Sequence, residues 1–454
     1  MSQDLPRLRT QILRVTDKEL GKFRDGDRDG DGQEKLGLWE VSHSESPSIK
    51  ILHDAAHYLK TKNTPVAFPT ETVYGLGADA TRSAAVKGIY TAKKRPSDNP
   101  LIIHISDLEM LRSILVPENG SNGTTNTSHD RIPEIYKPLI KKFWPGPLTI
   151  LLPNPDPSRL APEVTAGLKT FGARMPNSPL ALTLIKLTGA PLAAPSANAS
   201  TKPSPTTAEH VLEDLDGRIE FILDGGPCFV GVESTVVDGL CDPPLILRPG
   251  GVSIDELRSC PGWEKVEKGY KDQSEMGKSA PRAPGMKYKH YSPKATVILY
   301  EATFAAGHDG IQAREVESFL QGRSSQEIPN GGSEGLKVGI IRTRHWKPAA
   351  GLRCGGFRSE TAKTQNGQEN HMTIELGVQE AELYGNTTEA PIGKLMDVSI
   401  GTDTRSIAHG LFSALRELDR RGADLIFVEG TGDDEDIGAA VMNRLRKAAS
   451  HIRS

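Results

Sequence analysis

The stretch VAFPTETVYGLG, residues 66–77, predicts the first strand of the fold and the loop that follows it. Its apolar start, residues 66–68, comes directly after a turn signal and predicts a buried strand. From Pro69 the residues become polar, with two glycines, which predicts a loop at the end of that strand. Upstream, apolar residues between 51 and 59 recur at helical spacing. The sequence therefore predicts a helix followed by a strand.

The same alternation continues outward from this stretch. It predicts helices at 83–94 and 180–187 and strands at 101–105, 148–152 and 191–194. After Arg248-Pro249-Gly250 the apolar periodicity stops, and then a second set follows, with strands at 296–300, 338–341 and 425–428 and helices at 407–418 and 437–448. Alternating helices and strands are typical of α/β folds with a mixed sheet covered by helices. We predict an N-terminal arm (1–47), a domain (48–260), a linker (261–292) and a smaller domain (293–454).

Composition limits the classes of function. The 454 residues carry a net charge of -3, which argues against a protein that holds polyanions by bulk electrostatics, so a nucleotide must meet a local cluster of cations. The four cysteines lack the paired spacing of a zinc site. No apolar run is long enough to span a membrane. We expect a soluble, cytoplasmic protein, and the mixed charges of the first 20 residues leave a mitochondrial pool open.

Two stretches imitate known binding loops without completing them. Residues 21–35 resemble a calcium loop, but Leu36 occupies the position that needs a bidentate Glu, so a solvated insertion is predicted. Gly226 and Gly231 have the spacing of a phosphate loop, but Val232 stands where Lys is required. Neither a metal cage nor a phosphate-loop ATPase is predicted.

Four cations are candidates for an anion site at the carboxyl ends of the predicted strands. Lys93 falls on the apolar face of its helix, and Arg95 comes where Pro96 ends that helix, so the two can converge on an anion. The alternative is that the lysines only complement the negative end of the helix. Arg174 and Arg248 end predicted strands, although a surface salt bridge explains Arg174 equally well. The set suits a polyphosphate beside a small polar substrate, with catalysis by positioning and charge stabilisation.

Neutral polar residues extend this candidate site. His104 closes an apolar strand, where a histidine is more often a satisfied core residue than a ligand contact. Ser196, Asn198 and Ser204 lie in a loop after a strand, and such short hydrogen-bonding residues either cradle phosphates or form an ordinary Ser/Pro loop.

Eight motifs then stand in order along the chain, namely PTETVYGLG, KKRPSDNPLIIH, FWPGPLT, RMP, PSAN, GVESTVVD, LRPG and PGMKYKHYSP. With them the sequence closely resembles the threonylcarbamoyl-AMP synthases, the long, two-domain members of the YrdC-like family. The resemblance covers about residues 48–454 and includes IGAAVMNRLRKAA near the C-terminus. It implies an α/β fold with a twisted, mixed-sheet YrdC-like catalytic domain and a smaller Rossmann-like C-terminal domain.

The resemblance also implies a reaction. L-Threonine, bicarbonate or carbon dioxide, and ATP give threonylcarbamoyl-AMP, pyrophosphate and water, with Mg²⁺ accompanying ATP and no dedicated protein metal site. The product passes to a separate tRNA threonylcarbamoyl transferase complex that modifies adenosine in tRNA. No membrane partner and no stable nucleic-acid binding are expected.

Site residues follow from the motif positions. The resemblance assigns Lys93 and Arg95 to catalysis. The implied threonine contacts are Thr72, His104, Arg174, the backbone at Ala194, and Ser234. The implied ATP contacts are Arg95, Asn99, Thr170, Ser196, Asn198, Ser204, Arg248 and Tyr291, and Tyr291 implies that the linker acts as a lid over the nucleotide.

Two other functions remain open from the sequence. A carbamoyltransferase of the same domain family would bring paired-cysteine zinc modules, which this sequence lacks. An RNA-binding translation factor would bind RNA without ATP and with a steep salt dependence, which the near-neutral composition does not favour.

Overall fold

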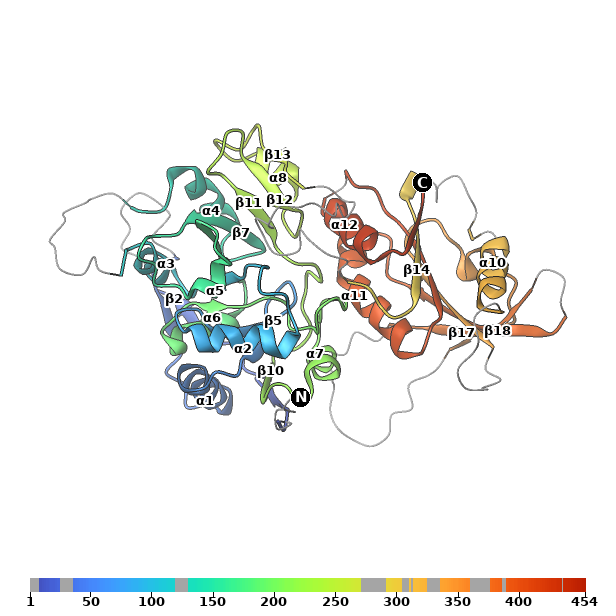
Figure 1. The fold of residues 1–454 in the computed structure, drawn as a ribbon, viewed down its shortest axis with the longest axis horizontal. Helices are drawn as coiled ribbons and strands as arrows, with labels where there is room; N and C mark the ends of the chain where they lie inside the picture. The colour runs from blue at the N-terminus through green and yellow to red at the C-terminus, as the bar shows by residue number, and fades with distance from the viewer. Residues whose placement is uncertain are drawn as a thin grey trace. The chain divides into compact units, whose positions relative to one another are not determined.

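The computed structural model describes residues 8–24, 36–118, 130–270, 291–303, 310–311, 313–324, 335–359, 376–385, 389–434 and 436–454. The chain divides into two compact units, Met1–Tyr288 and Lys289–Ser454 (Figure 1). Residues 25–35 of the predicted insertion, residues 119–129, and residues 271–290 of the predicted linker lie outside the described residues. Within the described ranges, no helix is both long enough and apolar enough to pass through a membrane.

The first unit is built on an eleven-stranded sheet in the order β1-β10-β4-β5-β9-β6-β8-β7-β11-β12-β13. Parallel pairs such as β6 with β8 alternate with antiparallel pairs such as β7 with β8, so the sheet is mixed, as predicted. The strands are β1 (Gln11–Arg14), β4 (Val66–Pro69), β5 (Tyr74–Asp79), β6 (Ile102–His104), β7 (Leu148–Pro153), β8 (Thr170–Arg174), β9 (Leu192–Ala193), β10 (Phe221–Asp224), β11 (Thr235–Asp238), β12 (Leu245–Arg248) and β13 (Glu267–Lys268).

Helices cover this sheet and begin at recognisable capping residues. The Ser46 side chain accepts a hydrogen bond from the backbone N–H of Ile49 at the start of α1, and Ser178 caps α6 in the same way. Leu52 and Leu59 of α1 pack with Leu184 of α6 in one apolar cluster. The helices are α1 (Pro47–Thr61), α2 (Ser83–Lys93), α3 (Leu108–Ile114), α4 (Lys137–Phe143), α5 (Pro162–Thr165), α6 (Pro179–Thr188), α7 (Ala208–Leu215) and α8 (Ile254–Arg258).

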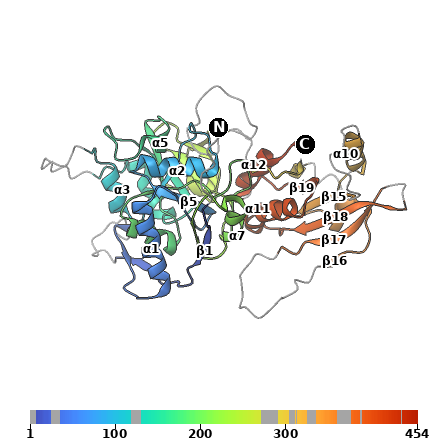
Figure 2. The same ribbon diagram turned by 60° about the horizontal axis from the view of Figure 1, so that its bottom comes forward.

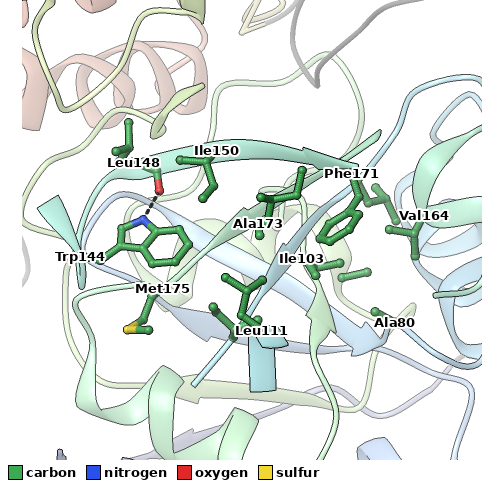
Figure 3. Packing of buried hydrophobic residues seen from close by; sticks show 14 of the residues in the cluster. Ala80, Ile103, Leu111, Trp144, Leu148, Ile150, Val164, Phe171, Ala173 and Met175 are labelled. Carbon is green, nitrogen blue, oxygen red and sulfur yellow. Dashed lines mark hydrogen bonds between the residues drawn. The ribbon is translucent and has the colours of Figure 1, made fainter. Parts of the chain in front are cut away.

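The main core lies on one face of the central strands. Ile103, Ile150, Phe171 and Ala173 come from β6, β7 and β8 and belong to the same buried cluster (Figure 3). Beside them the buried Trp144 ring donates a hydrogen bond from Nε1 to the Leu148 carbonyl at 2.8 Å. Because side chains alternate along a strand, the residues between these core positions belong to the opposite face of the sheet.

The predicted loop after β4 is shorter than the sequence indicated. Only residues 70–73 form a turn, and β5 begins at Tyr74 and pairs antiparallel with β4. The two glycines therefore lie in a buried strand instead of a ligand loop. A Cβ on Gly77 would lie 2.5 Å from Cε1 of Phe68, so close packing between the two strands requires glycine at this position.

Residues ahead of α1 also take part in the first unit. Strand β1 pairs in parallel with β10 at the edge of the sheet. Strands β2 (Gly21–Phe23) and β3 (Trp39–Val41) pair antiparallel with each other. The Trp39 ring is buried, and its Nε1 donates to Oγ1 of Thr183 on α6 at 3.0 Å. The N-terminal region thus supplies both an edge strand and a core side chain.

The second unit has a seven-stranded sheet in the order β16-β17-β18-β15-β19-β14-β20. Its strands are β14 (Thr296–Tyr300), β15 (Leu336–Arg342), β16 (Arg358–Ser359), β17 (Gln379–Tyr384), β18 (Pro391–Ser399), β19 (Leu425–Glu429) and β20 (His451–Arg453). The pairs from β18 to β20 are parallel, and β16 and β17 extend one edge in antiparallel fashion.

Helices α11 (Thr404–Arg420) and α12 (Gly438–Ala448) lie side by side (Figure 2). Helix α10 (Ala313–Ser324) packs through Val316 on the sheet. The predicted α/β class is confirmed for both units.

One buried carboxylate organises the carboxyl end of this second sheet. Glu429, at the end of β19, is fully buried and accepts hydrogen bonds from the backbone N–H groups of four successive residues, Thr343, Arg344, His345 and Trp346, at 2.8, 3.2, 2.5 and 3.2 Å. Successive N–H groups after a strand form a nest for an anion. In this unit the protein's own side chain fills that nest.

Candidate active site

The candidate residues on strands β6 and β8 lie on the face of the first sheet that is opposite the main core. His104 and Arg174 pair in register on β6 and β8, and Ile102 pairs with Gly172 two residues earlier. A Cβ on Gly172 would lie 3.1 Å from Cγ2 of Thr149 on β7, so neighbouring side chains leave little room at this strand position. Ile102, Leu151, Val236 and Leu247 form a separate small cluster on this face, which we call the apolar floor.

The structure confirms that these residues lie at the carboxyl ends of strands. His104, Arg174 and Arg248 are the last residues of β6, β8 and β12, three strands that run in the same direction. Thr170 instead begins β8 and lies at the other end of that strand. Because residues at every second position along a strand reach the same side of a sheet, Thr170 and Arg174 still share a face.

Arg174, a cation on this face, contacts three residues, namely Thr72, Gly146 and Glu71. Its Nη1 donates to Oγ1 of Thr72 at 2.9 Å and its Nε to the Gly146 carbonyl at 3.1 Å. Its Nη2 lies 2.7 Å from Oε1 of Glu71, and both side chains are buried. That approach is not aligned as a hydrogen bond, so Nη2 and both carboxylate oxygens of Glu71 keep hydrogen-bonding capacity. The salt bridge weighed from the sequence was a surface one, whereas the ion pair in the structure is buried and its partner is Glu71.

His104 lies beside this cation and stays neutral. Burial, and then the positive charge of Arg174, lowers the pKa of His104 from its ordinary 6.5 to about 3. Its Nδ1 is buried and has no hydrogen-bond partner among the described residues. A neutral imidazole can donate or accept one hydrogen bond at each ring nitrogen, so His104 suits a hydroxyl group better than an anion.

Ser234 and Arg248 form a second buried group next to the apolar floor. Arg248 donates from Nε and Nη2 to the Ser234 carbonyl at 3.1 and 2.9 Å, and from Nη2 to Ser234 Oγ at 3.1 Å. Ser234 Oγ also lies 2.8 Å from Oγ1 of Thr149. These contacts fix the Ser234 hydroxyl on the same face as Arg174.

Lys93 has a partner that neither reading of the sequence considered. At the end of α2 it is only 2% exposed, and its Nζ donates to the carbonyls of Ser196 and Asn198 at 2.5 and 2.6 Å and to Asn198 Oδ1 at 3.2 Å. Ser196 Oγ in turn lies 2.5 Å from Asn198 Oδ1. Lys93 therefore joins α2 to the loop after β9 and orders the hydroxyls of that loop.

Three further residues that the resemblance assigns to ATP are Arg95, Asn99 and Ser204. Arg95 is half-buried and donates to the carbonyls of Asn99 and Pro100 at 3.4 and 3.1 Å. Asn99 is buried, and its Oδ1 has no hydrogen-bond partner within the described ranges. Ser204 donates to Oε1 of Glu233 at 2.6 Å. Glu233 is thus a second buried acid at the site that the sequence analysis did not select.

Two predicted residues stand apart from these groups. The Ala194 N–H already donates to the Ile102 carbonyl at 3.0 Å, so within the described residues its backbone is part of the sheet. Tyr291 belongs to the second unit, where its buried ring stacks on Phe412 with ring centres 5.2 Å apart and lies 6.0 Å from the Arg444 guanidinium carbon. The prediction that Tyr291 covers a nucleotide stays a prediction.

Unpaired polar atoms mark this face as a binding site. Within the described part of the first unit, buried side-chain nitrogen or oxygen atoms without a hydrogen-bond partner occur in six residues, and four of them are Glu71, Asn99, His104 and Arg174. Buried polar groups are nearly always paired, so such a group of exceptions points to a polar ligand. No group of three His, Cys, Asp or Glu side chains that could hold a metal ion was found among the described residues.

Glu71 is the main site residue that sequence reasoning missed. It lies within the motif PTETVYGLG, and the available signal was an acidic residue between two threonines directly after an apolar strand. That signal is weak, because most acidic residues in turns are solvated.

Family models match the two halves of the chain. Residues 59–250 match the model Sua5_yciO_yrdC, described as "Telomere recombination". Residues 252–450 match the model described as "Threonylcarbamoyl-AMP synthase, C-terminal domain".

Several characterised relatives are similar over most of their length. The threonylcarbamoyl-AMP synthase of Schizosaccharomyces pombe is 44% identical over 421 residues, which cover 91% of both chains. The Bacillus subtilis protein of the same name is 41% identical over 410 residues, 90% of this chain and 96% of its own. The crystal structure of P. abyssi Sua5 complexed with L-threonine aligns with a TM-score of 0.66 and 34% identity, and covers 98% of this chain and 99% of that one.

Proposed function

The chain belongs to the family of threonylcarbamoyl-AMP synthases of the two-domain Sua5 type, and from this premise we propose the reaction that it catalyses. The substrates are L-threonine, bicarbonate or carbon dioxide, and ATP; starting from bicarbonate, the products are threonylcarbamoyl-AMP, pyrophosphate and water. The observation that carries this proposal is the group of buried, unpaired polar atoms in the first unit, three of which belong to residues at the family's motif positions: Asn99, His104 and Arg174.

The threonine half of the site rests on the chemistry around Arg174. Its guanidinium suits the α-carboxylate of an amino acid, since Nη2 retains a free donor direction. Neutral His104 suits the threonine hydroxyl, with Thr72, Ser234 and the backbone at Ala194 as further contacts. The crystal structure of P. abyssi Sua5 with L-threonine supports this choice of substrate.

The ATP half uses the residues around the loop after β9. We assign Arg95, Asn99 and Arg248 to ATP, together with Thr170, Ser196, Asn198, Ser204 and Tyr291. Lys93 contributes by ordering the Ser196–Asn198 loop as well as by its charge. Mg²⁺ enters with the triphosphate as part of this substrate.

The chemical steps need charge stabilisation more than a nucleophile from the protein. The neutral threonine amine forms a bond to the carbon of carbon dioxide, one carbon–oxygen π bond opens, and a proton leaves the nitrogen, which gives a carbamate. A carbamate oxygen then attacks the α-phosphorus, the bond from that phosphorus to the bridging oxygen breaks, and pyrophosphate leaves. Positive charge from Lys93 and Arg95 offsets the negative charge that develops on the phosphates.

The proposal also covers the partner that receives the product and the compartment of the reaction. The adenylate product is passed to a separate tRNA threonylcarbamoyl transferase complex, and the reaction takes place in the cytoplasm with a mitochondrial pool left open. Relatives at 41–44% identity over most of the chain are named threonylcarbamoyl-AMP synthase, which does not favour a carbamoyltransferase or an RNA-binding translation factor.

One assay tests the proposed function. Purified protein receives labelled bicarbonate, L-threonine and Mg²⁺–ATP, and the expected result is a labelled adenylate with one pyrophosphate per adenylate. Arg95→Ala should lower this turnover at least about 100-fold, the scale on which single charge-stabilising groups act. Lys94→Asn is the matched control, because Lys94 is exposed and has the left-handed backbone conformation that Asn tolerates. Wild-type protein that forms no adenylate would disprove the function.

A further inference from the structure

Glu71 is a buried acid whose surroundings leave it incompletely satisfied. It is 7% exposed, and neither carboxylate oxygen accepts a hydrogen bond within the described residues. Its charged neighbour is Arg174, whose Nη2 lies 2.7 Å from Oε1 without hydrogen-bond alignment. Burying a carboxylate in this way is costly unless a further partner completes its hydrogen bonds.

Two other buried acids, Glu429 and Asp397, accept several hydrogen bonds each. Glu429 accepts four backbone N–H groups. Asp397 accepts from Nε of Arg342 at 2.7 and 3.0 Å and from the Ala349 N–H at 2.8 Å. Glu163 and Glu315 each leave one buried oxygen unpaired, but their other oxygen accepts a hydrogen bond. Glu71 differs from all four examples, because neither of its oxygens accepts a hydrogen bond within the described residues.

Local structure holds Glu71 firmly in place. Thr70 Oγ1 donates to the Val73 carbonyl at 2.7 Å and accepts from the Thr72 N–H at 3.2 Å, which closes the turn around Glu71. The Glu71 carbonyl accepts from the Val230 N–H at 2.8 Å. The position of the carboxylate beside Arg174 is therefore built in before any ligand arrives, which is the property expected of a binding residue.

Charge balance indicates what the missing partner is. Without ligand, Arg174 and Glu71 form a neutral pair. An amino acid that places its α-carboxylate on Arg174 adds one negative charge beside buried Glu71, and this repulsion must be compensated. The α-ammonium group of the same amino acid supplies the compensating charge and the N–H donors that both Glu71 oxygens lack.

We propose that Glu71 binds the α-ammonium group of threonine while Arg174 binds the α-carboxylate, so that the two side chains form a receptor for the zwitterion. This inference rests on the proposed function and adds a selecting residue to it. It explains why a buried acid lies next to the cation that is meant to attract a carboxylate. It also confines the site to ligands that carry both charges on adjacent groups.

The test compares two ligands on the variant Glu71→Gln by isothermal titration calorimetry. L-Threonine carries both charges, and 3-hydroxybutanoate keeps the carboxylate and the hydroxyl but lacks the ammonium group. Glu71→Gln should weaken threonine binding at least about 10-fold, the lower end for loss of a charge-assisted hydrogen bond. Binding of 3-hydroxybutanoate should be unchanged or tighter, because the repelling carboxylate is gone.

Controls separate this role from damage to the fold. Glu163→Gln is the matched variant, since Glu163 also has a buried, unpaired carboxylate oxygen but lies outside the site, and it should bind threonine like the wild type. Equal weakening of both ligands by Glu71→Gln, or no change for threonine, would overturn the inference. If Glu71→Gln does not fold, Glu71→Asp keeps the charge and should retain the preference for threonine over 3-hydroxybutanoate; loss of that preference would also overturn it.

Failure of this inference is distinct from failure of the proposed function. Wild-type protein that forms the labelled adenylate, alongside a Glu71→Gln variant with normal threonine affinity, leaves the function standing and removes the role of Glu71. Wild-type protein that forms no adenylate removes the function itself.

Discussion

His104 should make the first unit sensitive to acid. The folded protein keeps this side chain neutral, with a pKa of about 3, whereas the unfolded chain takes up a proton near the ordinary value of 6.5. A depressed pKa in the folded state means that stability is present above pH 6.5 and is lost as the pH falls towards 3. Between pH 7 and pH 4.5 the loss from this one group amounts to about 2.5 kcal/mol of unfolding free energy.

The measurement must isolate His104 from the carboxylates that also titrate. Urea-dependent hydrogen–deuterium exchange of peptides from β6 and β8 reports the first unit alone, and it is followed at several pH values for wild type and His104→Gln. The variant should lack the His104 contribution, so the wild type should lose about 2.5 kcal/mol more than the variant between pH 7 and pH 4.5.

An exposed histidine provides the control for this experiment. His53 lies on the solvent side of α1, and His53→Gln should show the wild-type pH dependence. Parallel curves for wild type and His104→Gln would refute the reasoning that burial keeps His104 neutral. The same result would remove the argument that a neutral imidazole receives the threonine hydroxyl.

Three further substitutions test the packing. Lys93→Met leaves one buried and one partly buried carbonyl without their donor, so the first unit should lose about 2–5 kcal/mol in urea unfolding and the affinity for ATP should fall. Lys87→Met, on the exposed side of α2, is the control. Gly77→Ala places a Cβ 2.5 Å from Phe68 and should lower the unfolding free energy of the first unit by about 1–3 kcal/mol in urea unfolding. If the variant is as stable as the wild type, β4 and β5 pack more loosely than the structure shows. Glu429→Gln should lower the unfolding free energy of the second unit by about 3 kcal/mol, because an amide NH2 group replaces one acceptor oxygen. Hydrogen–deuterium exchange of peptides that follow β15 measures this loss, and unchanged exchange there would contradict it.

Much of the fold was predictable because its apolar patterns are local. The strand at 101–105 and the helix at 83–94 appear as β6 and α2, and the helices around 407–418 and 437–448 appear as α11 and α12. These segments carry enough apolar residues at one period to identify them. Strand β1 was not visible from the sequence, because four residues at a sheet edge carry too little pattern and their partner β10 lies some two hundred residues later in the chain.

The sequence selected candidate residues, some of which the structure brings close together. It did not predict the hydrogen bonds and ion pairs that these residues form. Motif positions selected His104 and Arg174, which the structure brings into register on neighbouring strands. No local pattern tells that Lys93 donates to carbonyls about a hundred residues later, or that Glu71 pairs with Arg174. Such contacts depend on the order of strands in the sheet, which hydrophobic periodicity does not encode.

The participation of the N-terminal region in the sheet bears on how this protein can be shortened. The family match begins at residue 59, inside α1 and well after β1 and Trp39. A protein trimmed to that boundary would leave β10 as an unpaired edge strand, remove most of α1 and leave a cavity beside α6 where the Trp39 ring packs. The smallest autonomous catalytic fragment therefore starts near residue 8, and preparations that begin later should aggregate through the uncovered strand.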